Sequence, residues 1–174
     1  MHQAEVLQWI EYEDSVARSE RIRRLEWLVS NYPASDLGFL ISGGWLSLRL
    51  LEEAKYCFVY GQFLATAILS VAFIERVIAA RFYAAGRDDL ERAGGLDLLR
   101  GALNAGWIDQ QQFEQFDRIR RLRNPIVHFR RPLSRDTIEY RAVQSDVGPD
   151  QLASDDAQEI LRAAFLVVES CSVR

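Results

Sequence analysis

The sequence has few residues of the kinds that bind metals or carry redox chemistry. Its 174 residues include two cysteines, two histidines and one methionine. Cys57 and Cys171 do not stand at the spacing of metal-ligand pairs, and their apolar helical surroundings are typical of buried thiols in a reducing cytoplasm. His2 is the second residue of the sequence, so His128 is the only internal histidine. We therefore expect neither a metal nor a cofactor, and we expect a cytoplasmic protein.

Long apolar runs are also missing. The most apolar stretch, residues 63–74, spans only twelve residues before Glu75 and Arg76, which is too short to cross a bilayer. No signal-peptide pattern is visible. The glycines at 38, 43 and 44 lack the spacing and the following lysine of a phosphate-binding loop. These absences predict a protein without a membrane segment and without a glycine-rich nucleotide loop.

Positive charge is scarce in the chain as a whole but concentrated in one stretch. The chain has 21 basic and 25 acidic residues, a net charge of −4 and a pI of about 5.3, which argues against a general nucleic-acid coat. Residues 118–135 nevertheless contain seven arginines and His128 without a single carboxylate. The length and the 49% of hydrophobic residues suit one well-packed domain. We therefore expect a single acidic domain with one local basic groove.

The stretch around His128 predicts a helix, a break and a second helix. Apolar residues recur at helical spacing between Asp109 and Arg123. Pro125 lacks the N–H that a helix interior needs and disfavours the α conformation at Asn124. Asparagine is also a favoured cap, and proline is a favoured first helical residue. We therefore predict a break at Asn124 and a new helix from Pro125, with His128 in its first turn.

This geometry predicts a phosphate site. The start of the second helix would offer unpaired N–H groups and a partial positive charge, and Arg123 would add a bidentate contact. The same field would favour neutral His128, which can accept a proton near pH 7. Such groups suit RNA cleavage by the 2′-hydroxyl, which needs a base, an acid and charge stabilisation but no metal. Further substrate contacts are expected from Arg120, Arg121, Arg130 and Arg131.

A structural interpretation of the same residues stays open. An arginine-rich helix with Glu114 and Asp117 nearby can be a solvated face with weak ion pairs, and a lone histidine can be a surface residue. Glu75 stands in an apolar helix, where a carboxylate needs a partner. An arginine of the basic stretch is one candidate, in which case Glu75 would orient Arg123. The alternatives are that Glu75 pairs with a structural arginine or reaches solvent.

The motif formed by Arg123, Asn124 and His128, with four residues between the arginine and the histidine, resembles the signature of the HEPN superfamily. Residues 52–75 are similar to the central helix pair of that family, and the resemblance covers about residues 46–172. It implies an all-helical domain, usually a two-fold dimer, and often a metal-independent endoribonuclease among prokaryotic toxins and abortive-infection effectors. Arg123, Asn124 and His128 would be the catalytic residues. One toxin subgroup carries a tyrosine, modified by a partner enzyme, two residues after the motif histidine, where this chain has arginine, so that mode of regulation is not implied here.

The rest of the chain reads as helices joined by loops. We predict one or two helices over residues 3–31, a loop over 32–45, helices over 46–60 and 61–85, a short turn at 88–92 and a helix over 96–103. Residues 130–153 are predicted as an irregular loop, open to a short hairpin because Ile138, Tyr140 and Ala142 alternate with polar residues, that could gate the groove. Ser154 is predicted to cap a final helix that ends near Ser172.

Together these features predict an all-α, HEPN-like bundle of roughly five to seven helices. Residues 1–45 form an N-terminal extension, which is either a plain packing helix or an added cap or dimerisation arm, and residues 46–174 form one compact domain. The predicted function is metal-independent RNA cleavage by a toxin or antiviral defence effector. RNA, a second copy of the chain and an antitoxin or regulatory protein are the expected partners. The alternative is a non-catalytic helical module that binds a nucleotide, RNA or a protein through the same groove.

Overall fold

All regular secondary structure in the described part of the chain is helical, which confirms the predicted all-α class. The computed structural model describes residues 3–36, 38–90, 92–131 and 133–170, and within them it has seven α-helices, one short 3-10 helix and no strand. In chain order the elements are α1 (Gln3–Asn31), α2 (Gly44–Val59), α3 (Phe63–Ala84), η1 (Asp88–Leu90), α4 (Gly95–Asn104), α5 (Gln110–Val127), α6 (Ile138–Ser145) and α7 (Pro149–Ser170). The expectations placed on His2, Cys171 and Ser172 fall outside the described residues.

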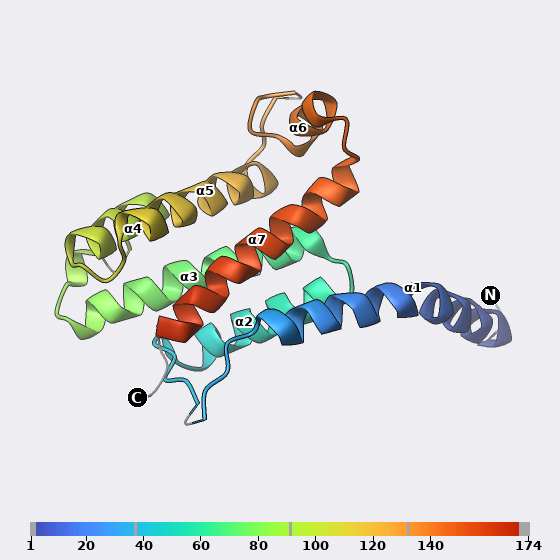
Figure 1. The fold of residues 1–174 in the computed structure, drawn as a ribbon, viewed down its shortest axis with the longest axis horizontal. Helices are drawn as coiled ribbons and strands as arrows, with labels where there is room; N and C mark the ends of the chain where they lie inside the picture. The colour runs from blue at the N-terminus through green and yellow to red at the C-terminus, as the bar shows by residue number, and fades with distance from the viewer. Residues whose placement is uncertain (1–2, 37, 91, 132, 171–174) are drawn as a thin grey trace.

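Helix α3 is the centre of the bundle, with α2, α4, α5 and α7 packed around it (Figure 1). The side chains of Phe73, Ile74 and Val77 are buried, as expected for a central apolar helix. The predicted helix over residues 61–85 is therefore confirmed, whereas the expectation that its twelve-residue apolar run is too short to cross a bilayer does not hold for the whole helix of 22 residues. By length and composition alone α3 could cross a membrane, a property that buried core helices share.

Two glycine turns set the limits of α3. Gly61 lies between α2 and α3 with φ 77°, and Gly86 follows the end of α3 with φ 73°. Both angles are in the left-handed region, which glycine adopts without steric cost. The predicted boundaries of these helices, near residues 60–61 and at residue 85, are therefore confirmed, and α2 and α3 form a helical hairpin.

Helix α1 is one continuous helix of 29 residues, of which only the second half packs on the bundle. Leu28 is buried, and the ring of Trp27 lies 4.9 Å from the ring of Phe58 on α2. Residues 3–16 are exposed, apart from a partly exposed Val6, and project away from the bundle (Figure 1). The interpretation as a packing helix therefore holds for the second half of α1 and leaves the first half without an explanation.

The region predicted as an irregular loop contains helix α6, so the hairpin expectation was wrong. Thr137 caps this helix by accepting a hydrogen bond from the backbone N–H of Tyr140. The alternation of Ile138, Tyr140 and Ala142 is too short to distinguish a strand from a single pair of helical turns. The loop between α5 and α6 is accordingly short, and α6 lies against α7.

Helix α7 begins at Pro149, earlier than predicted, and Ser154 lies inside it. Proline suits the first position of a helix, because the missing N–H would have no partner there. Asp156, only 7% exposed, makes ion pairs with Arg141 of α6. Hydrogen bonding to Asp156 raises the pKa of Arg141, which keeps its guanidinium charged despite partial burial. This pair joins α6 to α7 beside the end of α5.

Candidate functional site

Helix α5 runs through Asn124 and Pro125 without a break, which overturns the predicted second helix. Pro125 lies in the last turn, so it removes a single internal hydrogen bond close to the natural end of the helix. Ile126 packs against the core immediately after the proline and holds the chain in the direction of the helix. The N–H of His128 donates to the carbonyl of Asn124 at 2.9 Å and closes the last turn. Core packing therefore overrides the local preference for a break.

His128 consequently lies at the C-terminal cap of α5, not in the first turn of a helix. Its backbone is extended, with φ −122° and ψ 125°. The C-terminal end of a helix carries the negative end of the helix dipole, so the predicted N-terminal phosphate site at Pro125 does not exist. Any phosphate bound here must be held by arginine side chains. The imidazole of His128 is exposed and makes no hydrogen bond or ion pair with another described residue.

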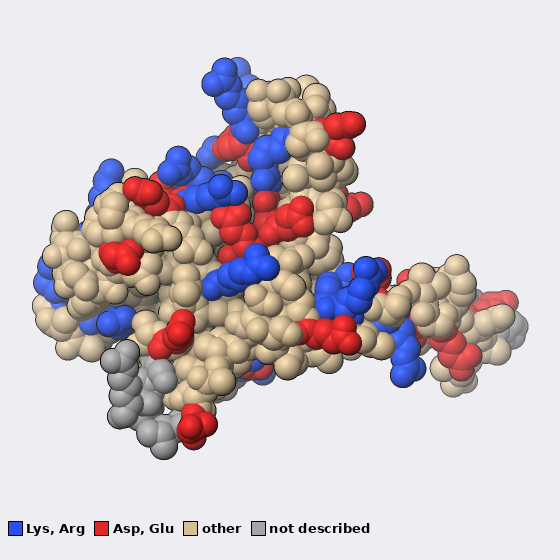
Figure 2. All heavy atoms as spheres, in the orientation of Figure 1, with Lys and Arg blue, Asp and Glu red and all other residues tan. Residues whose placement is uncertain are grey.

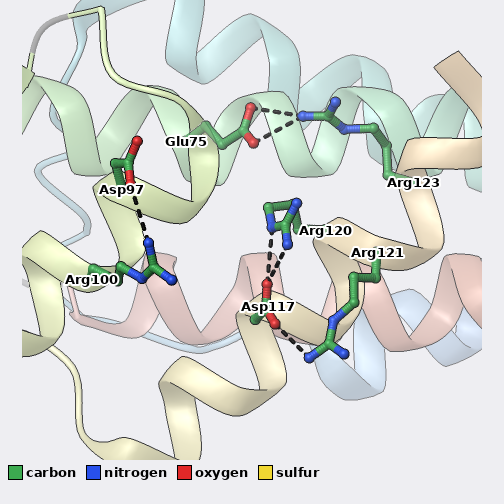
Figure 3. Close-up of polar contacts among 7 residues, drawn as sticks. All are labelled: Glu75, Asp97, Arg100, Asp117, Arg120, Arg121 and Arg123. Carbon is green, nitrogen blue, oxygen red and sulfur yellow. Dashed lines mark hydrogen bonds and ion pairs between the residues drawn. The ribbon is translucent and has the colours of Figure 1, made fainter. Parts of the chain in front are cut away.

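Arg123 is held in place by Glu75 of the central helix (Figure 3). Its Nη2 donates to both carboxylate oxygens of Glu75 at 2.9 Å, and the two side chains are only 16% and 27% exposed. Glu75 thus has the partner from the basic stretch that its apolar helix required. Arg123 keeps further N–H donors, because Glu75 engages only one of its nitrogens. Its Nε is buried without a described partner.

Gly95, the first residue of α4, lies directly against this pair. A Cβ atom at this position would stand 2.2 Å from Oε1 of Glu75 and 3.3 Å from Cδ of Arg120. Only glycine leaves room for the carboxylate at this helix start, where the dipole also favours a negative charge. The adjoining Gly94 has open space around it. Nothing in the sequence marked this glycine pair as part of a site, although its place just before the helix predicted at residues 96–103 was visible.

Arg120 is oriented by two neighbours on its own helix, of which Figure 3 shows Asp117. Asp117 accepts from its Nε at 3.0 Å and from its Nη2 at 2.6 Å. With the amide of Asn124 oriented to satisfy both of its polar atoms, the nitrogen donates to the Arg120 carbonyl and the oxygen accepts from Arg120 Nη1, each at 3.1 Å. Asn124 therefore positions an arginine and does not form a helix break.

Asp117 is shared between Arg120 and Arg121, and its side chain is 14% exposed. Burial raises the pKa of Asp117, but hydrogen bonds and the charges of both arginines outweigh burial and leave that pKa below its ordinary value. Asp117 was noted in the sequence only as a neighbouring charge. The three- and four-residue spacing to the two arginines was the available signal for this network.

Five of the seven arginines in residues 118–135 have carboxylate partners, so the basic stretch carries less free charge than its composition suggests. Besides Arg120, Arg121 and Arg123, these are Arg118, paired with Glu159 of α7, and Arg130, paired with Asp136 at 3.3 Å. Arg131 and Arg135 are exposed and have no ion pair among the described residues. Glu114 accepts from Gln110 and contributes nothing to this neutralisation.

An apolar groove begins where the motif ends. Its volume is about 580 Å³, and its lining includes Leu64 of α3, Ile126 of α5, Leu133 of the following loop and Ile138 of α6. Phe129, directly after His128, also lines the groove and is 87% exposed. Phe129 and Leu133 have no signal in the sequence that predicts a groove, because a lone apolar residue in a basic loop carries no periodicity.

The structure thus brings Arg120, Arg123, Asn124 and Glu75 together and leaves His128 separate. Arg123 lies within α5, whereas His128 has an extended backbone at the C-terminal cap, and no hydrogen bond or ion pair among the described residues joins the two side chains. Arg130 lines the groove. Arg131 does not line it and makes no ion pair with another described residue. No group of three or more potential metal ligands exists among the described residues.

Comparisons of the chain with protein-family models, with curated proteins and with solved structures gave no match. The class of the molecule therefore rests on its fold and on the geometry of the site. The molecule is an all-helical bundle in which carboxylates hold Arg120 and Arg123 of α5, and an exposed histidine, His128, follows the end of the same helix.

Proposed function

We propose that the protein is a metal-independent endoribonuclease of HEPN type that cleaves RNA at a dimeric site formed by Arg123 and His128. The resemblance of the Arg123–Asn124–His128 motif supplies the class of reaction. The observation that carries the proposal is the arrangement around Arg123, in which a carboxylate orients the guanidinium and leaves donors free. A prokaryotic toxin or antiviral defence effector is the proposed biological setting, in the cytoplasm, with an antitoxin or regulatory protein as a further partner.

In this proposal Arg123 binds the scissile phosphate and stabilises the charge that develops on it. Glu75 acts through Arg123 as a positioning residue, because it fixes the direction of the guanidinium without touching RNA. Arg120, held by Asp117 and Asn124, lies beside the same pair and supplies a second contact to the phosphate. Arg121, Arg130 and Arg131 attract the RNA backbone from the surrounding surface.

His128 is the proposed proton-transfer group, and its exposure without a side-chain partner leaves it open to substrate. A base removes the proton of the 2′-hydroxyl, the 2′-oxygen bonds to phosphorus, and the 5′-oxygen leaves with a proton from an acid. The products are a 2′,3′-cyclic phosphate and a 5′-hydroxyl. One chain offers one such histidine within the fold, so a two-fold axis beside the end of α5 would supply the second from the other protomer.

Incubation of the pure protein with a mixture of RNAs, with and without EDTA, tests this proposal. We expect cleavage in both samples and products that end in a 2′,3′-cyclic phosphate. Loss of activity with EDTA, or products with 3′-hydroxyl ends, would contradict the mechanism. A protein that binds RNA but leaves it intact would favour the second candidate function.

The second candidate is a non-catalytic helical module that binds a nucleotide, RNA or a protein through the same surface. The isolation of His128 favours it, because no hydrogen bond or ion pair with another described residue orients the imidazole for proton transfer. Binding of this kind depends on total arginine charge and weakens with salt. It does not depend on His128, and this difference separates the two candidates.

A further inference from the structure

The first half of α1, residues 3–16, is an exposed helix that we call the arm. Its large apolar side chains are exposed by 44–64%: Leu7, Trp9, Ile10, Tyr12 and Val16. Trp9, Tyr12 and Val16 are three and four residues apart, so they share one face of the helix. Contiguous apolar side chains on a surface mark an interaction site. A short helix that projects into water is also marginally stable without a partner.

The arm carries only negative charge. Its ionisable residues are Glu5, Glu11, Glu13 and Asp14, with no lysine or arginine among residues 3–16. Asp14 pairs with Arg21 at 2.9 Å, whereas Glu11 and Glu13 make no ion pair with another described residue. Figure 2 shows these acidic side chains spread along the projecting helix. The partner of the arm must therefore be apolar along one stripe and positively charged beside it.

The groove beside the motif has this complementary character. Its exposed apolar lining includes Leu64, Leu133 and Phe129, which are 48%, 56% and 87% exposed. The loop that forms its wall also carries Arg131 and Arg135, the two arginines of the basic stretch without an ion pair among the described residues. Basic side chains extend over this loop at the top of Figure 2. Glu139 also lines the groove, so Arg130, Arg131 and Arg135 exceed the carboxylates of Asp136 and Glu139 by one positive charge. The side of the groove formed by this loop is therefore the side that matches the carboxylates of the arm.

The arm cannot reach the groove of its own chain, because α1 is continuous and carries the arm away from the bundle (Figure 1). The base of the arm and the groove nevertheless lie at the same end of the molecule. Arg24 of α1 donates to the carbonyl of Val59 at 2.9 Å, at the turn that leads into α3 and Leu64. A two-fold axis at this end would place each arm on the groove of the other copy.

We propose that the arm of one protomer docks in the groove of a second copy of the chain, and that the exchange is reciprocal. Pairing of two arms with each other is disfavoured, because it brings eight carboxylates together. An anionic membrane surface would repel the arm, since helices that lie on membranes carry lysine and arginine on their polar face. The symmetric contact uses two arms and two grooves, so it buries twice the area of a single arm in a single groove. Specific complexes bury roughly 1,200–2,000 Å² in total.

This assembly places the partner's arm against Phe129, the residue after His128, so the interface adjoins the proposed catalytic end of α5. The inference concerns assembly alone and holds whether or not the protein cleaves RNA. Its test needs no RNA, so failure of the docking and failure of the proposed function are distinguishable.

Sedimentation of the full chain tests the docking. We expect a dimer, and we expect the Trp9→Ala/Tyr12→Ala variant to raise the dissociation constant at least about 30-fold, as loss of interface hot spots does. The matched control is Trp45→Ala/Leu48→Ala, which removes exposed apolar side chains from α2 and should leave the dimer intact. A wild-type monomer, or a dimer that the arm variant does not weaken, would overturn the inference.

Charge reversal identifies the two surfaces that meet. Glu11→Arg/Glu13→Arg alone and Arg131→Glu/Arg135→Glu alone should each weaken the dimer about tenfold or more, because like charges then face each other. An equimolar mixture of the two proteins should recover the affinity, since both junctions of the mixed dimer become complementary. If the Arg131→Glu/Arg135→Glu protein dimerises with the wild-type affinity, the dimer does not use the groove, as when the two arms pair with each other. If the mixture does not recover the affinity, the arm and the groove do not meet.

Discussion

The two ends of the Arg123–His128 motif are built in opposite ways. Arg123 lies 16% exposed against the central helix and is tied to Glu75, whereas His128 is exposed at the end of α5 without a described side-chain partner. The arginine is part of the packing between α3, α4 and α5, and the histidine follows the last helical residue. A charge in a packed interior must be paired, while a proton-transfer group must reach its substrate. The same motif therefore combines a structural anchor with an accessible reactive group.

This difference predicts that substitutions at the two ends separate stability from activity. An anchored charge contributes to both, because removing its partner leaves an uncompensated charge inside the protein. An exposed histidine contributes to activity alone.

His128→Ala should lower the rate of RNA cleavage by about 10²–10⁴-fold, the usual contribution of a proton-transfer group. The free energy of unfolding should change by less than about 0.5 kcal/mol, because the side chain is exposed and makes no described contact. Initial rates on a short RNA and urea unfolding measure the two quantities. His2→Ala, which removes the only other histidine, is the control and should cleave at the wild-type rate. A His128→Ala protein that unfolds would assign the histidine a structural role.

Glu75→Ala and Arg123→Ala should each destabilise the protein by about 2–3 kcal/mol, somewhat less than for a fully buried pair because both groups retain some exposure. The double variant should cost less than the sum, with a coupling energy of about 1–2 kcal/mol, since it leaves no unpaired charge. The same cycle on Arg49 and Glu53 is the control. That pair has the same 2.9 Å separation but is 46% and 52% exposed, so its coupling should stay near 0.3–0.5 kcal/mol. Equal coupling in the two cycles would remove the distinction between anchor and surface pair.

Gly95→Ala should destabilise the protein by about 1 kcal/mol, although alanine favours helices over glycine by about that amount. The new Cβ would meet the Glu75 carboxylate at 2.2 Å and displace it from Arg123. Gly94→Ala is the matched control, with nothing near its Cβ and an extended backbone at φ −67°. In a Glu75→Ala background the penalty of Gly95→Ala should disappear. A penalty that persists there would mean that another contact opposes the methyl group.

The sequence predicted the bundle well because most helix limits depend on local chemistry. Asp109 and Gln112 form a reciprocal capping box at the start of α5, and Gly61 and Gly86 take the left-handed angles that end helices. The apolar sequence of α3 predicted both the central position of that helix and its approximate limits. These features are local enough to be visible in one sequence.

The errors arose where distant packing decides the local structure. Pro125 stays helical because Ile126 packs on the core, which no local preference reveals. That one error reversed the electrostatics assumed for His128. The partner of Arg123 was a candidate from the sequence, since Glu75 needed a positive charge, but the choice among seven arginines depends on how α5 crosses α3. A carboxylate in an apolar helix therefore predicts that a partner exists, but the sequence alone does not identify which residue that partner is.

Asp117→Asn should have the smallest effect, below about 1 kcal/mol at pH 7, because asparagine can still accept hydrogen bonds from Arg120 and Arg121. Burial raises the pKa of Asp117, but the hydrogen bonds and charges of Arg120 and Arg121 leave it below the ordinary value. A lowered folded-state pKa stabilises the protein above the ordinary aspartate value of about 4, and this contribution is lost as the pH falls through the folded-state pKa. In urea unfolding the two proteins should therefore differ most at pH 7 and less at pH 3, below the ordinary aspartate value. Asp97→Asn is the control, because its pair with Arg100 is exposed and 3.6 Å long, so we expect little change at either pH. An Asp117→Asn penalty of equal size at both pH values would show that the shape of the side chain matters there and its charge does not.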